Sequence, residues 1–225
     1  MYPRHESRDG PASHSARGFA FGVLKSGGIA GRVNLDSRIM NAQTAHHQLF
    51  DTAIGECGVA WNARGLVGVQ LPEKDRGATE LRLAVKCHST HAAEVPPWIQ
   101  SVISDIQRYL AGQKVDFSAI TVDLDGIDDF RQKLYAALRG IGFGRTTTYG
   151  ELARQLGSTD WEGARDVGDA MGRNPMPIVI PCHRVLAAGG KLGGFSAYGG
   201  PTTKQKLLAL EGVQVGNAPP RLPGL

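Results

Sequence analysis

The residues with the clearest chemical potential are a cysteine, a histidine and an arginine in a row, Cys182-His183-Arg184. A thiol must lose its proton before it can attack carbon, and a free thiol is largely protonated near neutral pH. The adjacent imidazole offers a base and the guanidinium a positive field, and Glu211 is a candidate carboxylate to orient the imidazole. We therefore expect Cys182 to be a nucleophile. The alternative is a structural cysteine buried in an apolar loop.

The segments on either side of this cysteine predict a rigid support. Pro177 and Pro181 bracket the apolar run Ile178-Val179-Ile180, which should be buried. Apolar residues also recur at helical spacing from residue 130 to 138. A last helix is expected from Pro201, ending before Gly212.

Two further helices are predicted by capping boxes, in which a Thr hydroxyl and a Glu carboxylate each satisfy a backbone N–H at the helix start. Thr148-Tyr149-Gly150-Glu151 opens a helix over residues 149–156, and Thr159-Asp160-Trp161-Glu162 opens one over residues 160–171. The pair has helix-turn-helix proportions. That is a weak indication of DNA binding, because any small helical hairpin shares it.

The first half of the chain predicts a small antiparallel meander with one helix. Residues 1–45 are rich in Gly, Ser, Arg and His and are expected to form a flexible tail, to which His46 and His47 are also assigned. The expected elements after the tail are strands at residues 49–54, 57–61 and 66–71, a helix at 98–110 and a further strand at 117–124.

Charge is spread unevenly along the chain. Residues 130–225 carry twelve Lys and Arg against six Asp and Glu, whereas residues 40–129 carry seven against twelve. A basic second half indicates a polyanionic partner that this half alone meets, although such asymmetry also arises by chance on solvated faces.

The cysteine count points to free thiols. Cys57, Cys87 and Cys182 cannot all pair within one chain, and the N-terminus has no apolar segment of a secretory signal. Cys57 and Cys87 with His88 and His91 offer four zinc ligands, but their spacing is not that of a zinc site. We expect no metal.

A longer stretch decides between nucleophile and structural cysteine. The run Asn174-Pro175-Met176-Pro177-Ile178-Val179-Ile180-Pro181-Cys182-His183-Arg184-Val185 resembles the signature of the O6-alkylguanine-DNA alkyltransferases, the methylated-DNA–protein-cysteine methyltransferases. The resemblance covers residues 130–212 and is looser over 49–129. It implies repair of O6-alkylguanine in duplex DNA by irreversible alkyl transfer to Cys182, once per molecule and without a cofactor. Whether O4-alkylthymine is also accepted is left open.

The resemblance also implies an architecture. The expected fold is α/β (α+β), with a ribonuclease-H-like strand and helix subdomain over residues 46–125. A helical, winged-helix-like domain with the helix-turn-helix follows over residues 126–213, and residues 214–225 form a C-terminal tail. We expect a monomer that binds double-stranded DNA in the bacterial cytoplasm, or in the nucleus of a eukaryote.

Roles at the reaction centre follow from the same resemblance. Cys182 would accept the alkyl group, His183 would deprotonate it through a water molecule, and Glu211 would orient His183. Asn174 would tie the DNA-reading helix to the active-site turn. Tyr149 would protonate or hydrogen-bond the departing guanine.

The remaining roles concern the base and the DNA. The backbone N–H of Ser196 would contact the O6 region, and the carbonyls of Cys182 and Val185 would accept from the exocyclic amine. Arg165 would enter the base stack in place of the extruded nucleotide. Small residues would allow close approach to the minor groove. The DNA-binding residues expected besides Arg165 are Ala164, Gly168, Arg173 and Thr148.

Two departures from the family pattern concern the DNA-reading helix and the helix before it. Asp166 and Asp169 stand where small residues are usual, and Asp169 is spaced to pair with Arg165 or Arg173. Residues 126–130 replace the commoner Gly-Thr-Pro-Phe. The residue at which the following helix begins is therefore left open.

Three other functions compete with this one. A non-enzymatic binder of alkylated DNA would lack the acceptor cysteine, which this chain has in Cys182. A helix-turn-helix transcription factor would leave Pro181-Cys182-His183-Arg184 without a use. A thiol hydrolase would use the cysteine, histidine and glutamate to turn over a soluble ester or amide.

Overall fold

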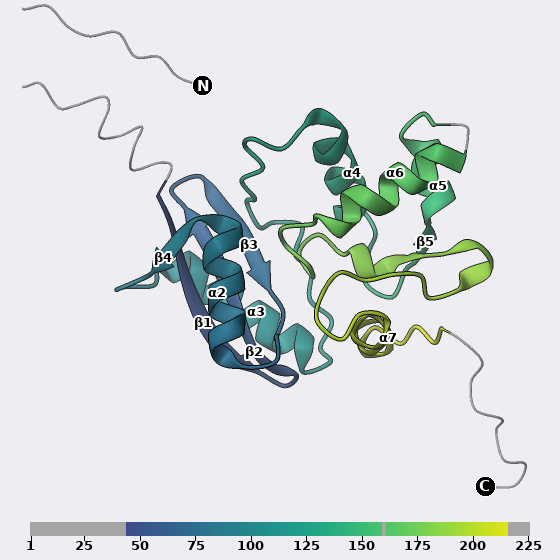
Figure 1. The fold of residues 1–225 in the computed structure, drawn as a ribbon. Helices are drawn as coiled ribbons and strands as arrows, with labels where there is room; N and C mark the ends of the chain where they lie inside the picture. The colour runs from purple at the N-terminus through teal and green to yellow at the C-terminus, as the bar shows by residue number, and fades with distance from the viewer. Residues whose placement is uncertain (1–43, 159–160, 216–225) are drawn as a thin grey trace, which may run out of the picture. The chain divides into compact units, whose positions relative to one another are not determined.

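The computed structural model describes residues 44–215 except 159–160, and these form a mixed α/β fold (Figure 1). Residues 1–43 of the expected tail and the start of the second capping box, Thr159-Asp160, lie outside the described residues, whereas Ala45, assigned to the tail, begins the first strand. Within the described residues no helix is long and apolar enough to cross a membrane. Val215, placed in the expected C-terminal tail, is buried in a cluster with Leu186 and Leu208.

The first subdomain is built on a four-stranded sheet in the order β3-β2-β1-β4. The antiparallel meander is as predicted, with strands β1 (Ala45–Thr52), β2 (Gly55–Asn62) and β3 (Gly65–Gln70). The short strand β4 (Ser89–His91) was not predicted and pairs with β1 in parallel. The assignment of His46 and His47 to the tail was wrong. Both lie in β1, where side chains alternate between buried and exposed and His47 faces inward.

A helix covers each face of this sheet (Figure 1). The predicted helix is present as α3 (Pro97–Leu110) and packs in the main core. The other, α2 (Arg76–Cys87), was not predicted. Its N-cap is Asp75, whose carboxylate accepts from the N–H of Ala78 at 2.8 Å. Its apolar residues Leu81, Leu83 and Val85 recur at every second position, a spacing that does not indicate a helix, and of these three only Leu83 is buried.

The strand expected over residues 117–124 is absent. Within this segment only Val122 forms a bridge, to Leu66 in β3, and residues 118–119 form a turn. The apolar residues that suggested alternation pack individually instead, as Phe117 does against the ring of Tyr109. Packing by single side chains does not need a continuous ladder of backbone hydrogen bonds.

The second subdomain is mostly helical, as predicted. The helix α4 (Asp129–Arg139) begins cleanly despite its unusual preceding sequence, because the Asp128 carboxylate accepts from the N–H of Arg131 at 2.9 Å. The other elements are β5 (Thr147–Thr148), α5 (Tyr149–Gln155), α6 (Trp161–Gly172), the 3-10 turn η1 (Cys182–Arg184), β6 (Val185–Leu186), the turn η2 (Ala188–Gly190) and α7 (Pro201–Leu210). Strands β5 and β6 pair in parallel, which places the start of α5 beside the end of the turn that holds Cys182.

Candidate active site

The turn that holds Cys182 is fixed by one buried amide, that of Asn174. Its Nδ2 donates to the carbonyl of Ile180 at 2.7 Å and to Cys182 Sγ at 3.1 Å. Its Oδ1 accepts from the N–H of Met176 at 2.9 Å. Because Asn174 lies two residues after α6, it joins the end of that helix to the cysteine turn.

The backbone before the cysteine is strained. Ile178 is buried and has φ 76°, in the left-handed region that β-branched residues rarely adopt. Such a conformation costs on the order of 1–3 kcal/mol and persists only where surrounding contacts enforce it. Two hydrogen bonds close the backbone around it: the N–H of Ile180 donates to the carbonyl of Met176 at 2.8 Å, and the carbonyl of Ile180 accepts from Asn174.

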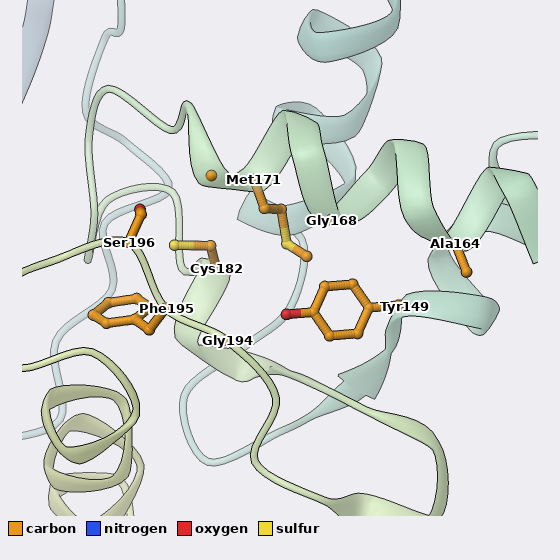
Figure 2. A pocket seen from close by; sticks show the side chains of 9 residues that line it. Tyr149, Ala164, Gly168, Met171, Cys182, Gly194, Phe195 and Ser196 are labelled. Carbon is orange, nitrogen blue, oxygen red and sulfur yellow. The ribbon is translucent and has the colours of Figure 1, made fainter.

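Cys182 is only 6% exposed, yet it lines a pocket of about 490 Å³ (Figure 2). This volume lies within the range of small-molecule sites, roughly 300–1,000 Å³. Figure 2 shows the Tyr149 hydroxyl directed toward the end of the pocket that holds Cys182. The other lining residues are Ala164, Gly168, Met171 and Gly172 of α6, with Gly194, Phe195 and Ser196 of the segment before α7.

A buried carboxylate, Glu211, lies behind the cysteine turn at the end of α7. Its Oε1 lies 2.8 Å from His183 Nε2 and accepts from the Tyr109 hydroxyl at 2.7 Å. The Arg184 guanidinium donates to both oxygens, and Oε2 also accepts from the N–H of Gly144 at 2.9 Å. Burial alone would raise the pKa of Glu211, but the hydrogen bonds from His183 and Arg184 outweigh it and lower the pKa to about 2.

This carboxylate selects the tautomer of His183. An ionised carboxylate only accepts hydrogen bonds, so Nε2 of His183 carries a proton and donates to Glu211. Nδ1 of His183 then holds the lone pair, and it has no hydrogen-bond partner within the described residues. Burial, partly opposed by Glu211, lowers the pKa of His183. The imidazole is therefore a neutral base with one free nitrogen.

The thiol itself needs help to ionise. Burial raises the pKa of Cys182, and the hydrogen bond from Asn174 and the positive charge of Lys204 act in the opposite direction. Burial likewise raises the pKa of Tyr149, which keeps its hydroxyl protonated and able to donate. Burial also raises the pKa of the two other cysteines, to about 12 for Cys57 and to about 11 for Cys87, and neither of them lines the pocket.

Sequence reasoning missed three residues of this site, Lys204, Tyr109 and Lys86. Lys204 is buried and donates from Nζ to the carbonyls of Val185 at 2.5 Å and Gly194 at 3.2 Å. The available signal was the spacing of Lys204 from Leu207 and Leu208, three and four residues later, which places all three on one face of α7. Tyr109 belongs to α3 of the other subdomain, and no local pattern connects it to Glu211.

The first subdomain also holds the cysteine turn from outside. Lys86 of α2 donates from Nζ to the carbonyl of Asn174 at 3.0 Å. The N–H of Val69 in β3 donates to the carbonyl of Pro175 at 3.0 Å. Both contacts reach the short segment between α6 and Cys182, so the sheet subdomain contributes directly to the position of the thiol.

The predicted DNA-binding residues lie on α6, directly after it, and at the N-cap of α5. Arg165, Asp166 and Asp169 are exposed on α6, and no ion pair within the described residues joins Asp169 to Arg165 or Arg173. Arg173 is exposed just beyond the helix. The Thr148 hydroxyl accepts from the N–H of Glu151 at 3.2 Å, which completes the predicted capping box.

Of the expected base-contacting residues, Ser196 and Tyr149 line the pocket and Val185 does not. Val185 is fully buried, and its carbonyl already accepts from Lys204. A carbonyl oxygen has two lone pairs, so this contact leaves room for a second donor.

Comparison with known proteins agrees with this arrangement. Residues 45–124 match the family model for the ribonuclease-like domain of 6-O-methylguanine DNA methyltransferase, and residues 129–213 match that for its DNA-binding domain. The methylated-DNA–protein-cysteine methyltransferase of Mycobacterium tuberculosis H37Rv is 34% identical over 166 residues, which cover 74% of this chain and 92% of that protein. The corresponding protein of Methanothermobacter thermautotrophicus is 32% identical over 169 residues, covering 75% and 84%.

Solved structures show the same likeness. The crystal structure of Mycobacterium tuberculosis OGT in complex with DNA matches with a TM-score of 0.59 and 34% identity, over 74% of this chain and 92% of that one. The O6-methylguanine-DNA methyltransferase of Pyrococcus kodakaraensis KOD1 matches with a TM-score of 0.57 and 27% identity, over 76% and 100%. The fold and site are those of a DNA-binding alkyl-group acceptor. The chain belongs to the 6-O-methylguanine-DNA methyltransferase family.

The buried carboxylate predicts a pH dependence of stability. The folded-state pKa of Glu211, about 2, lies below its ordinary value of 4.5, so its contribution is complete above pH 4.5 and is lost as the pH falls toward 2. We expect Glu211→Gln to lower the free energy of unfolding at pH 7 by roughly 3 kcal/mol and to flatten the loss of stability in acid. Urea unfolding at several pH values measures both. The exposed-site variant Glu94→Gln should change neither, and an unchanged acid profile in Glu211→Gln would contradict this role.

Proposed function

We propose that this protein reverses O6-alkylguanine damage in duplex DNA by moving the alkyl group onto Cys182. The observation that carries the proposal is the placement of the Cys182 thiol. It lines a pocket the size of a small ligand and accepts a hydrogen bond from Asn174. Next to it in sequence is a neutral imidazole oriented by Glu211.

The chemistry balances without a cofactor. The Cys182 proton passes through a water molecule to Nδ1 of His183, which Glu211 keeps free of its own proton. The thiolate then attacks the alkyl carbon, the new S–C bond forms, and the C–O6 bond breaks with its electron pair left on the guanine. The hydroxyl of Tyr149 donates to the departing base. The thioether is stable, so each molecule acts once.

The alkyl carbon of a stacked guanine is shielded, so the nucleotide must leave the helix before attack. Unstacking costs a few kcal/mol, and less for a damaged, poorly paired base. Ala164 and Gly168 lie both on α6 and on the pocket wall, which supports minor-groove approach with the extruded base entering beside them. Arg165 of the same helix fills the space left in the stack, while Thr148 and Arg173 meet the backbone.

Base recognition uses main-chain groups around the pocket. The N–H of Ser196 donates near O6, and the carbonyls of Cys182 and Val185 accept from the exocyclic amine. We infer that the protein acts as a monomer in the compartment that holds the genome, whether a bacterial cytoplasm or a nucleus.

The central test is to measure the mass of the peptide that contains Cys182 after incubation with duplex DNA carrying O6-methylguanine. We expect one added methyl group on that peptide, with the DNA restored to guanine in equal amount. Cys182→Ala should show neither, whereas Cys87→Ala should behave as the unaltered protein. Tight binding of the damaged DNA with an unmodified peptide would favour a binder that recruits other factors, and repeated hydrolysis of a soluble ester would favour a thiol hydrolase.

The hydrogen bond from Asn174 to the thiol predicts a shift in the pH profile. Asn174→Asp replaces the donor with a negative charge, and both changes raise the pKa of Cys182. We expect the transfer rate at pH 7 to fall at least tenfold and the deficit to shrink as the pH rises. Thiolate absorbance measured against Cys182→Ser reports the pKa directly. An equal deficit at every pH would indicate loss of structure and not of thiol activation.

The role of Arg165 predicts a difference between substrates. Removing a side chain that holds the stack open should slow repair of duplex DNA, while a free O6-alkylguanine base needs no extrusion. We therefore expect Arg165→Ala to slow duplex repair by roughly tenfold or more, since unstacking costs a few kcal/mol. The rate with the free base should stay within about twofold. Arg108→Ala removes the same charge from α3, distant in the chain from Arg165, and is the matched control. Equal slowing on both substrates would contradict the role.

A further inference from the structure

A second group of chemically active side chains lies outside the alkyl-transfer site, in the sheet subdomain. His47 of β1, Glu80 of α2 and His91 of β4 each offer one ligand atom, and the three atoms lie within 4.8 Å of one another. Within the described residues this is the one set of three or more His, Cys, Asp or Glu side chains so arranged. The cysteines considered from the sequence are not members of it.

The distances within this group suit a shared ion better than direct hydrogen bonds. Glu80 Oε1 lies 3.5 Å from His47 Nε2 and 3.6 Å from His91 Nδ1. Good hydrogen bonds between such atoms are roughly 2.7–3.2 Å long. Ligands bonded to tetrahedral zinc at about 2.0–2.1 Å are separated from one another by roughly 3.3 Å. Both distances from Glu80 are closer to the separation between two zinc ligands than to the length of a hydrogen bond.

The most buried member is held in the orientation that a metal ligand needs. The other ring nitrogen of His47, Nδ1, lies 3.0 Å from the hydroxyl of Ser89. A ligating histidine characteristically has its second nitrogen hydrogen-bonded in this way, which fixes the ring and the tautomer. His47 is 3% exposed, and its backbone is locked beside that of His91 in the parallel pairing of β1 and β4.

The same group remains accessible from solvent. The side chains of Glu80 and His91 are 38% and 53% exposed, so an ion can enter without opening the core. Two imidazoles and one carboxylate are donors that first-row divalent ions such as Zn²⁺ accept, whereas Ca²⁺ and Mg²⁺ prefer all-oxygen sites.

We propose that His47, Glu80 and His91 form a zinc site that fastens α2 and β4 to β1. Water completes the coordination on the exposed side. The site is structural: it joins three elements of the sheet subdomain and uses none of the alkyl-transfer residues. It replaces the sequence-based expectation of no metal and needs no cysteine.

The test uses the full chain without a histidine tag, freed of metal with EDTA and titrated with zinc sulfate. We expect one equivalent to bind, and the melting temperature to rise by roughly 5–10 °C at a free zinc concentration near 100 times Kd. His91→Gln and Glu80→Gln should each weaken binding at least tenfold and abolish the rise. His46→Gln, an exposed histidine one residue from His47, is the matched control and should bind as the unaltered protein does.

Cobalt distinguishes this site from metal capture by a thiol. Co²⁺ bound to two imidazoles and a carboxylate gives weak visible bands without the strong near-ultraviolet band of thiolate-to-cobalt charge transfer. We expect that spectrum, unchanged in Cys182→Ser. A charge-transfer band, no binding at one equivalent, or undiminished binding in well-folded His91→Gln would overturn the proposal. Circular dichroism of each variant confirms the fold.

Discussion

The buried carboxylate of Glu211 is the charge on which the active-site turn depends. It is 6% exposed and would be costly to ionise there, were it not surrounded by donors from three separate segments of the chain. Those donors are the side chains of Tyr109, His183 and Arg184 and the N–H of Gly144. Satisfying one anion therefore requires α3, the cysteine turn, the loop after α4 and the end of α7 to meet. The same requirement leaves the imidazole with a free nitrogen.

A second constraint acts on the other side of the sulfur. The amide of Asn174 uses both ends: its oxygen accepts from Met176 and its nitrogen donates to Ile180 and to the thiol. Such a network closes a loop that contains the left-handed Ile178, and it explains how a strained β-branched residue persists in the core. Because the loop begins at the end of α6, movement of that helix and the environment of the sulfur are mechanically coupled.

Much of this arrangement could be predicted from local sequence. The capping box at Thr148, the helix α3 and the buried run before Cys182 each follow from residues close together in the chain, and the Pro-Cys-His-Arg motif indicated the nucleophile. What failed depends on contacts between distant residues. In helix α2 the apolar residues Leu81, Leu83 and Val85 recur at every second position, and only packing against the sheet makes Leu83 the buried one. Residues 117–124 alternate in polarity, but only Val122 forms a bridge to a neighbouring strand, at Leu66.

The same reasoning explains the site residues that were missed. Tyr109 and Lys86 reach Glu211 and Asn174 from another subdomain, across 102 and 88 positions of sequence. His47 was placed in the tail because the first predicted strand began only at Leu49. Its burial becomes clear only when β4, which no pattern predicted, is seen beside it.

The hydrogen bond from Val69 to Pro175 has a consequence beyond positioning the sulfur. Strand β3 is an outer strand of the sheet, and its free main-chain groups would otherwise form a template for pairing with another molecule. Along this edge the N–H of Val69 donates to the carbonyl of Pro175. The main chain of Leu66 pairs with the carbonyl of Thr121 and the N–H of Asp123. The segment that leads to the nucleophile thus also covers part of this sheet edge, and unfolding of the second subdomain would leave the N–H of Val69 open to pairing with another chain.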